Sequence, residues 1–109
     1  DLLIMSTTKQ TLSGQVAPEQ IEQWKKRHGD IFGYAVDDKI GYLRRPSRQV
    51  VSLASVAGQN DPFKFAETVL VNCWLGGDEA LRTEDRYFMG LAQKINEIVE
   101  IKVGEIKKL

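Results

Sequence analysis

The chain has 109 residues and a mass of 12.3 kDa, with 15 basic and 15 acidic residues that give a formal net charge of zero. Hydrophobic residues make up 42% of the sequence and charged residues 28%, which is typical of a folded globular protein and argues against a disordered or membrane-embedded one. A protein that holds nucleic acid through its phosphates carries a basic excess, so the balanced charge counts against that role.

Cys73 is the only cysteine, so no internal disulfide can form and a secreted disulfide framework is not expected. No apolar run approaches the roughly 20 residues that span a bilayer. We therefore expect a protein of a reducing cytoplasm with no membrane partner. Met5, followed by Ser and Thr residues, has the character of a natural start, which predicts that residues 1–4 are vector-derived.

The sequence predicts an N-terminal arm followed by a helix. Residues 1–16 are predicted to be a flexible N-terminal arm, because they are rich in Ser, Thr and Gln, and residues 17–109 to form one domain. A helix is predicted over residues 18–28. Pro18 suits its first turn, and Gly29 can adopt the left-handed conformation that ends a helix.

Two short segments have the composition of β-strands. Residues 31–36 and 40–43 are rich in aromatic and β-branched residues, and the Asp-Asp-Lys sequence between them is a turn signal. Alternation places Phe32 and Tyr34 on one face of the predicted hairpin. A two-stranded hairpin is marginal alone, so it must pack on helices or pair with another strand. An unprotected hairpin edge can pair with a strand of a second copy, so a homo-oligomer is a hypothesis.

The second half of the sequence is predicted to be helical. Ser47 is the expected N-cap of one helix, and Asp61 with Pro62 starts the next, which the two glycines after Leu75 end. Thr83 is the expected cap of a last, long helix whose apolar stripe continues to Ile106. The predicted fold is therefore α+β and mainly helical, in the order α-β-β-α-α-α, with one short antiparallel hairpin.

Three features of the sequence are candidates for chemistry. The sequence Gly-Gly-Asp-Glu at 76–79 has the signature letters of diguanylate cyclases, but Ala80 stands where those enzymes have phenylalanine and the chain is too short for their domain. We interpret it as a loop that ends a helix. His28 is the only histidine, and with Cys73 it cannot build a typical zinc site. No catalytic, metal-binding or cofactor-binding residue is predicted.

Contact surfaces are the remaining candidates. The arginines at 44, 45 and 48 form a basic corner at a helix start, where anions are attracted, but no base-stacking aromatic residues are interleaved with them. Phe63 and Phe65 lie two apart on a predicted helix and cannot face the same way, so one of them is expected to be exposed. The candidate protein-contact residues are Arg44, Arg45, Arg48, Phe63, Phe65 and Tyr42.

The order of these elements is similar to that of a known group of small proteins. A strand leads through Leu-Arg-Arg-Pro-Ser-Arg into a helix, the next helix runs from Asp-Pro-Phe-Lys-Phe to Cys-Trp-Leu-Gly-Gly-Asp-Glu, and an Ile-, Lys- and Glu-rich segment closes the chain. Over residues 17–109 this layout resembles small proteins encoded among phage and prophage tail genes of Bacteroides-type bacteria, and is similar to tail assembly chaperones.

The resemblance implies a non-enzymatic role. Tail assembly chaperones bind the tape measure protein and recruit tail tube subunits during assembly, and they have no catalytic residues to carry over. The alternative that the residues themselves leave open is a small nucleic-acid-binding or regulatory module that uses the basic corner at 44–48.

Overall fold

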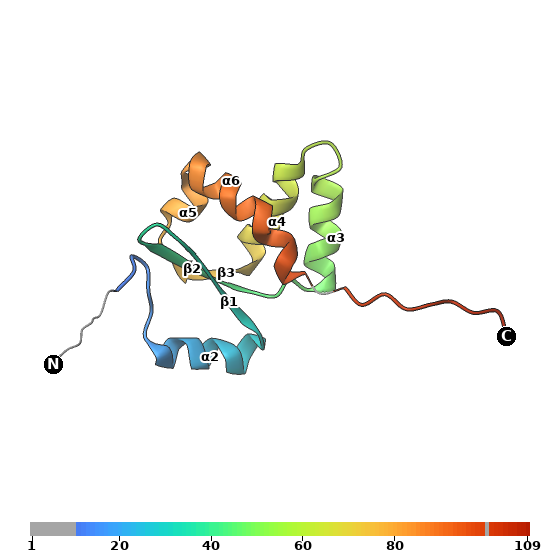
Figure 1. Ribbon diagram of the computed structural model, residues 1–109, viewed down its shortest axis with the longest axis horizontal. Coiled ribbons are helices and arrows are strands. Elements are labelled where there is room, and N and C mark those ends of the chain that lie inside the picture. Colours follow the sequence, from blue (N-terminus) through green and yellow to red (C-terminus); the bar gives the residue numbers. More distant parts are fainter. Residues whose placement is uncertain (1–10, 100) are drawn as a thin grey trace.

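The computed structural model of the protein describes residues 11–99 and 101–109, and this part of the chain has an α+β fold (Figure 1). It contains five α-helices, one 3₁₀-helix and a three-stranded antiparallel sheet, which confirms the predicted class. In chain order the elements are α2 (Pro18–His28), β1 (Ile31–Val36), β2 (Lys39–Arg44), α3 (Arg48–Ala57), α4 (Pro62–Cys73), β3 (Trp74–Gly77), α5 (Ala80–Thr83), α6 (Asp85–Lys94) and the 3₁₀-helix η1 (Ile95–Ile98).

The first helix and the hairpin confirm the prediction from the sequence. Helix α2 has the predicted bounds, and it ends where Gly29 takes a positive φ of 84° and donates its backbone N–H to the carbonyl of Lys25. Strands β1 and β2 pair antiparallel through a two-residue turn, with Val36 opposite Lys39 at the turn. Local signals are sufficient here because the residues that form each element are neighbours in the sequence.

The predicted hairpin is confirmed, and the expected pairing with another strand is supplied by β3, which adds a third strand on the other side of β2. The segment 74–77 was expected to end a helix, and instead Gly76 pairs with Tyr42 in the sheet. Gly77 permits this close approach: its φ is 131°, and a Cβ atom there would lie 2.5 Å from the carbonyl oxygen of Ile40. Strand β2 is therefore central, and among the described residues the outer edge of β1 has no strand partner.

The predicted N-caps of the two middle helices are confirmed. The Ser47 hydroxyl accepts a hydrogen bond from the N–H of Val50 at 3.2 Å, and the Asp61 carboxylate accepts one from the N–H of Phe63 at 3.0 Å. These helices pack with the sheet, α6 and η1 around one apolar core. The buried core residues are Leu43, Val50, Ala54, Ala66, Val69, Leu70, Cys73, Leu91, Ile95 and Ile98.

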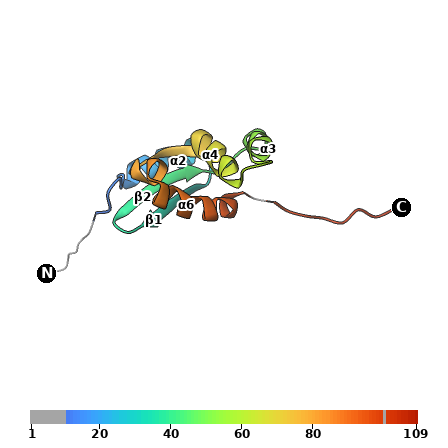
Figure 2. The ribbon, with the colours of Figure 1, turned by 90° about the horizontal axis from the view of Figure 1, so that it is seen from above.

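The predicted last helix from Thr83 to Ile106 is wrong in its length and in its start. Thr83 ends α5 instead of capping α6, and its hydroxyl donates to the carbonyl of Glu79 at 3.1 Å. Helical structure ends at η1, and residues 101–109 run extended away from the rest of the chain in both views (Figures 1 and 2). Their β-branched residues and Gly104 disfavour a helix, which no packing compensates.

The predicted N-terminal arm lies partly outside the described residues, which begin at Thr11. The described part, residues 11–16, lies beside the hairpin. Ser13 donates its N–H to the carbonyl of Asp38 at 2.7 Å and accepts from the N–H of Ile40 at 3.0 Å, so this segment extends the hydrogen bonding of β2. None of the helices that the structure describes is long and apolar enough to cross a membrane.

Candidate functional site

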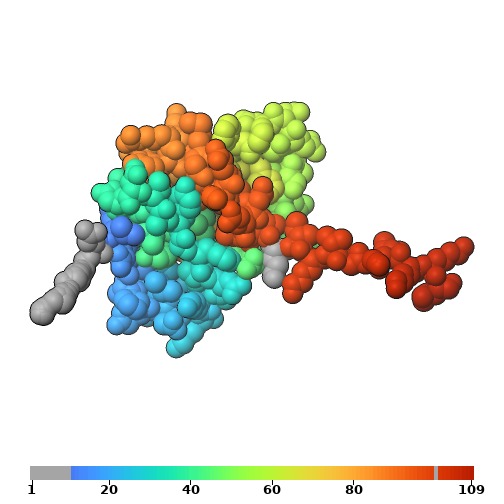
Figure 3. Space-filling model, in the orientation of Figure 1, coloured from blue at the N-terminus to red at the C-terminus, as the bar shows by residue number. Residues whose placement is uncertain are grey.

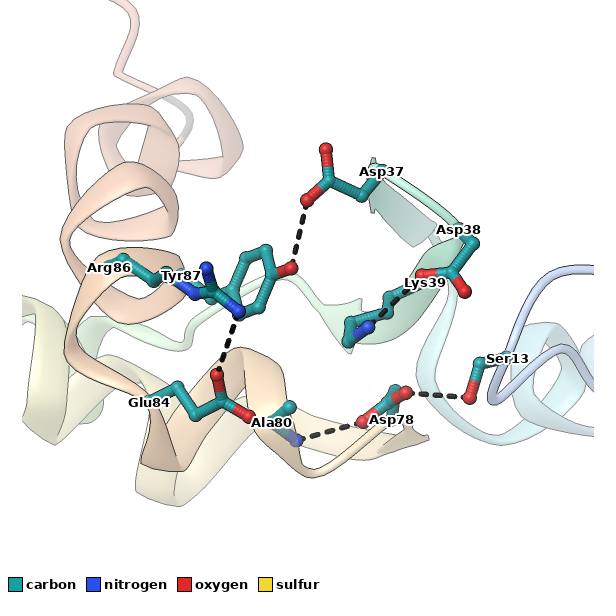
Figure 4. A network of polar contacts seen from close by, with 9 residues as sticks. All are labelled: Ser13, Asp37, Asp38, Lys39, Asp78, Ala80, Glu84, Arg86 and Tyr87. Carbon is teal, nitrogen blue, oxygen red and sulfur yellow. Dashed lines mark hydrogen bonds and ion pairs between the residues drawn. The ribbon is translucent and has the colours of Figure 1, made fainter.

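A network of polar side chains surrounds the hairpin turn (Figure 4). The Tyr87 hydroxyl on α6 donates to the Asp37 carboxylate at 2.8 Å, and the Lys39 ammonium donates to Asp38 at 3.0 Å and lies 5.3 Å from the centre of the Tyr87 ring. Beside them, Asp78 accepts hydrogen bonds from the Ser13 hydroxyl at 2.6 Å and from a backbone N–H. We call these residues the turn cluster. It joins the N-terminal segment, the hairpin turn, the end of β3 and α6.

The electrostatics of the turn cluster oppose proton transfer at neutral pH. The hydrogen bond between Lys39 and Asp38 raises the pKa of the lysine and lowers that of the aspartate. The Ser13 hydroxyl lowers the pKa of Asp78, and the hydrogen bond to Asp37 raises the pKa of Tyr87. Each shift moves the pKa further from 7, whereas an efficient general acid or base has its pKa near the working pH. The hydrogen bonds of the turn cluster link segments that lie far apart in the sequence.

The Gly-Gly-Asp-Glu sequence and Cys73 have structural roles. Gly76 and Gly77 belong to β3, so the Gly-Gly-Asp-Glu sequence is a strand end and not a helix-ending loop. Its last residue, Glu79, forms an ion pair with Arg82. Cys73 is buried in the core, and burial raises the pKa of its thiol. Within residues 11–99 and 101–109, no three His, Cys, Asp or Glu side chains are grouped to hold a metal ion.

The basic corner is largely engaged with the protein's own backbone. Arg44 donates to the carbonyl of Asn72 at 2.9 Å, and Arg45 donates to the carbonyl of Ile98 at 3.0 Å. Arg45 also pairs with Asp30 at 3.0 Å. Arg48 differs, because it lies exposed at the start of α3. Sequence reasoning missed these contacts because the acceptors lie 28 and 53 positions away in the chain.

The aromatic candidates separate into buried and exposed residues. Tyr42 is only 5% exposed and its ring lies 5.5 Å from that of Trp24, which places it between the sheet and α2. Phe65 is partly buried against the core, whereas Phe63 is 46% exposed. The prediction that one of this pair is exposed is confirmed. The contrast follows from their spacing, because residues two apart on a helix point in different directions.

A groove of about 570 Å³ with both apolar and charged lining residues lies between α4 and the α5–α6 segment. Its lining residues are Glu67, Leu70, Val71, Arg82, Thr83, Asp85 and Phe88. The ring of Phe63 lies 6.2 Å from that of Phe88, and Val71 is 72% exposed. We call this surface the α4–α6 groove. The available sequence signal was the second stripe of α4, in which Phe63, Glu67 and Val71 recur every four residues beside the buried stripe.

The side chains of the α4–α6 groove are of mixed polarity. Exposed apolar side chains lie beside the carboxylates of Glu67 and Asp85; Glu67 pairs with Lys64 at 3.7 Å, and the guanidinium of Arg82 pairs with Glu79. Comparison of the chain with protein-family models, with curated proteins and with solved structures finds no significant match.

Proposed function

We propose that the chain is a non-enzymatic assembly factor that binds a helical segment of a larger protein in the α4–α6 groove. The observation that carries the proposal is the exposure of Val71 (72%) and Phe63 (46%) beside the groove-lining ring of Phe88. Exposed apolar side chains that gather at a groove mark interaction surfaces, because leaving them in water costs free energy that a partner recovers.

The lining of the groove defines the chemistry of the partner. An amphipathic helix places anchors at i, i+3, i+4 and i+7 into a hydrophobic groove, and Phe63, Val71 and Phe88 offer the matching apolar surface. Asp85 supplies negative charge at the same place, and Glu67 adds a carboxylate that pairs with Lys64 at 3.7 Å. The best-fitting partner segment is therefore a helix with an apolar stripe and basic residues beside it, since opposite charges across an interface favour the correct partner.

The resemblance to tail assembly chaperones supports a specific version of the proposal. In that version the partner is the tape measure protein, tail tube subunits are recruited to the complex, and the work is done in the cytoplasm of the host bacterium. The turn cluster supports a non-enzymatic role, because the pKa values of Lys39 and Tyr87 are raised further above neutral pH, where general acids and bases work less well. A gene position between a major tail protein and a very long tape measure protein would support this version directly.

Co-expression tests the proposal. The tape measure protein is expressed with and without this chain, and its soluble fraction is measured after centrifugation. We expect the wild-type chain to raise that fraction and to co-purify with it. The Val71→Asp variant should lose both effects, because it places a charge in the groove. Leu53→Asp is the matched control, since Leu53 is 59% exposed on α3 and does not line the groove.

Two results would overturn the proposal. A tape measure protein that is equally soluble without this chain contradicts the chaperone role. Equal co-purification of Val71→Asp and wild type contradicts the groove as the binding site. Fluorescence anisotropy with duplex DNA at low salt tests the alternative module: binding that weakens steeply with salt and is lost in Arg48→Ala would favour nucleic-acid binding instead.

A further inference from the structure

The C-terminal segment 101–109 carries exposed apolar side chains, of which Ile101 also lines an open pocket with Pro46 and Val51. Ile101 is 74% exposed, Val103 is 90% exposed, and Ile106 and Leu109 are fully exposed. The space-filling view shows the segment standing clear of the body (Figure 3). Val99, Ile101 and Val103 alternate with polar residues, which is the pattern of a β-strand with one apolar face. The start of this segment therefore has the pattern of a strand but no strand partner within the described residues.

The outer edge of β1 carries backbone N–H and C=O groups that have no partner strand among the described residues. Because the turn has two residues, Val36 and Lys39 form a hydrogen-bonded pair. Hydrogen-bonded and non-hydrogen-bonded pairs then alternate along the antiparallel ladder. The backbone N–H and C=O groups of Ile31, Gly33 and Ala35 therefore point away from β2. Gly33 and Ala35 are both exposed, so small side chains leave this edge open to another strand.

An apolar groove runs beside the same edge. It has a volume of about 510 Å³, and it lies between β1 on one side and α6 with η1 on the other. Its apolar lining residues are Phe32, Tyr34, Ala35, Leu43, Leu91, Ile95 and Ile98. A strand that pairs with the outer edge of β1 would place every second side chain over this groove. The reason is that paired residues on neighbouring strands direct their side chains to the same face.

We propose that residues 101–109 of a second copy of this chain add to the outer edge of β1 as a strand, and that the exchange is reciprocal in a symmetric dimer. The segment begins just after Ile98, which lines the groove of its own chain. Residues 99–103 contain no Gly, Pro, Asn or Asp, so they are poorly suited to the tight turn that folding back onto their own β1 requires. Extended, the nine residues reach about 30 Å, which is enough to cross to a neighbouring copy.

Charge favours the parallel direction of this pairing. The turn end of β1 carries Asp37, Asp38 and Lys39, with a net charge of −1, and the opposite end of the hairpin carries Asp30, Arg44 and Arg45, with a net charge of +1. A parallel strand with Ile101 beside Phe32 places Ile101 and Val103 on the groove face, because paired residues share a face, and brings Lys107 next to Asp38. An antiparallel strand would place the lysines at 107 and 108 at the end with net positive charge, where like charges repel.

Sedimentation velocity over a range of protein concentrations tests the proposal on the full chain. We expect a dimer that dissociates on dilution. Ala35→Pro should shift the chain to monomer, because proline removes an N–H that points outward and leaves the β1–β2 ladder intact. Ala35→Ser is its matched control and should remain a dimer. Val103→Asp should also give monomer, whereas Glu105→Gln should not.

Circular dichroism and urea unfolding of each variant separate lost association from lost folding. Retained helical signal with a monomeric mass in both Ala35→Pro and Val103→Asp supports the proposal. A wild-type chain that is monomeric at every concentration overturns it. A dimer that persists in either of these two variants also overturns it, because the edge or the segment would then be dispensable. The groove variant Val71→Asp should remain a dimer, so this test is independent of the proposed function.

Cysteine cross-linking measures the direction of the pairing. One chain carries Ala35→Cys and the other carries a cysteine at position 101, 104 or 107, and the two are mixed under mild oxidation. Native Cys73 is buried and stays unreactive. The parallel register predicts the highest yield of mixed disulfide with position 104, which would lie beside Ala35. A highest yield with position 101 or 107 contradicts that register.

Discussion

The hydroxyl of Tyr87 donates a 2.8 Å hydrogen bond to the carboxylate of Asp37, fifty positions earlier in the chain. Asp37 has a φ of 55°, the one positive value at a non-glycine residue within the part of the chain that the structure describes. Aspartate tolerates this left-handed conformation better than most residues. The bond therefore connects a constrained turn residue to the first turns of α6, and the hairpin and the last helix position one another.

Removing the Tyr87 hydroxyl should weaken that connection without disturbing the ring. We expect Tyr87→Phe to unfold at a lower urea concentration than wild type with an unchanged slope, because a hydrogen bond is lost but the buried surface is kept. Asp37→Asn is the control: it retains an acceptor oxygen and tolerance of positive φ, so it should lie closer to wild type. An unchanged midpoint for Tyr87→Phe would show that the bond contributes nothing.

The hydrogen bond from Ser13 to Asp78 should make part of the stability sensitive to acid. The Ser13 hydroxyl lowers the pKa of Asp78 in the folded protein below its ordinary value near 4. The unfolded chain therefore takes up protons first as the pH falls. The resulting stabilisation is complete above about pH 4 and is lost as the pH falls through the lowered pKa of the folded state.

Ser13→Ala should consequently be less stable than wild type at pH 7, and the difference should shrink toward pH 2. Urea unfolding of both proteins across this range measures it. Ser13→Thr keeps the hydroxyl and serves as the control. A difference between wild type and Ser13→Ala that is the same at pH 7 and pH 2 would contradict the link to Asp78.

Gly77 should be among the least replaceable glycines of the chain. Its φ is 131°, and an added Cβ would lie 2.5 Å from the carbonyl oxygen of Ile40 in the facing strand. Gly77→Ala must strain the backbone or separate β3 from β2, and we expect a loss of more than about 2 kcal/mol in the free energy of unfolding. Gly104→Ala meets no atom within 4 Å and should change it by less than about 0.5 kcal/mol. Equal effects would disprove the steric argument.

Arg45 and Arg48 should respond differently to the same substitution. The guanidinium of Arg45 donates to Ile98 and to Asp30 and lies 4.8 Å from the centre of the Phe32 ring, and a lysine cannot make these contacts together. We expect Arg45→Lys to cost about 1 kcal/mol of unfolding free energy. Arg48→Lys, on an exposed residue, should be neutral within about 0.5 kcal/mol. Thermal or urea unfolding compares the two, and a neutral Arg45→Lys would count against its role at the end of η1.

The sequence alone determined the features whose causes lie within a few residues. Pro18 and Gly29 bound α2, the Asp-Asp turn joins β1 to β2, and Ser47 and Asp61 cap α3 and α4. Each of these signals acts through a turn or a cap that neighbouring residues complete. The same spacing argument predicted that Phe63 or Phe65 would be exposed, although it could not say which one.

The tertiary structure decided what depends on residues far apart in the chain. Strand β3 exists because β2 offers an edge that Gly77 can approach, and a Trp-Leu-Gly-Gly sequence carries little strand propensity of its own. The apolar residues beyond Ile98 recur at a spacing that predicts a helix. Spacing alone does not show whether such residues pack against the rest of the chain. The α4–α6 groove likewise needs two helices to meet. Burial and pairing are properties of the whole fold, so local pattern could not determine them.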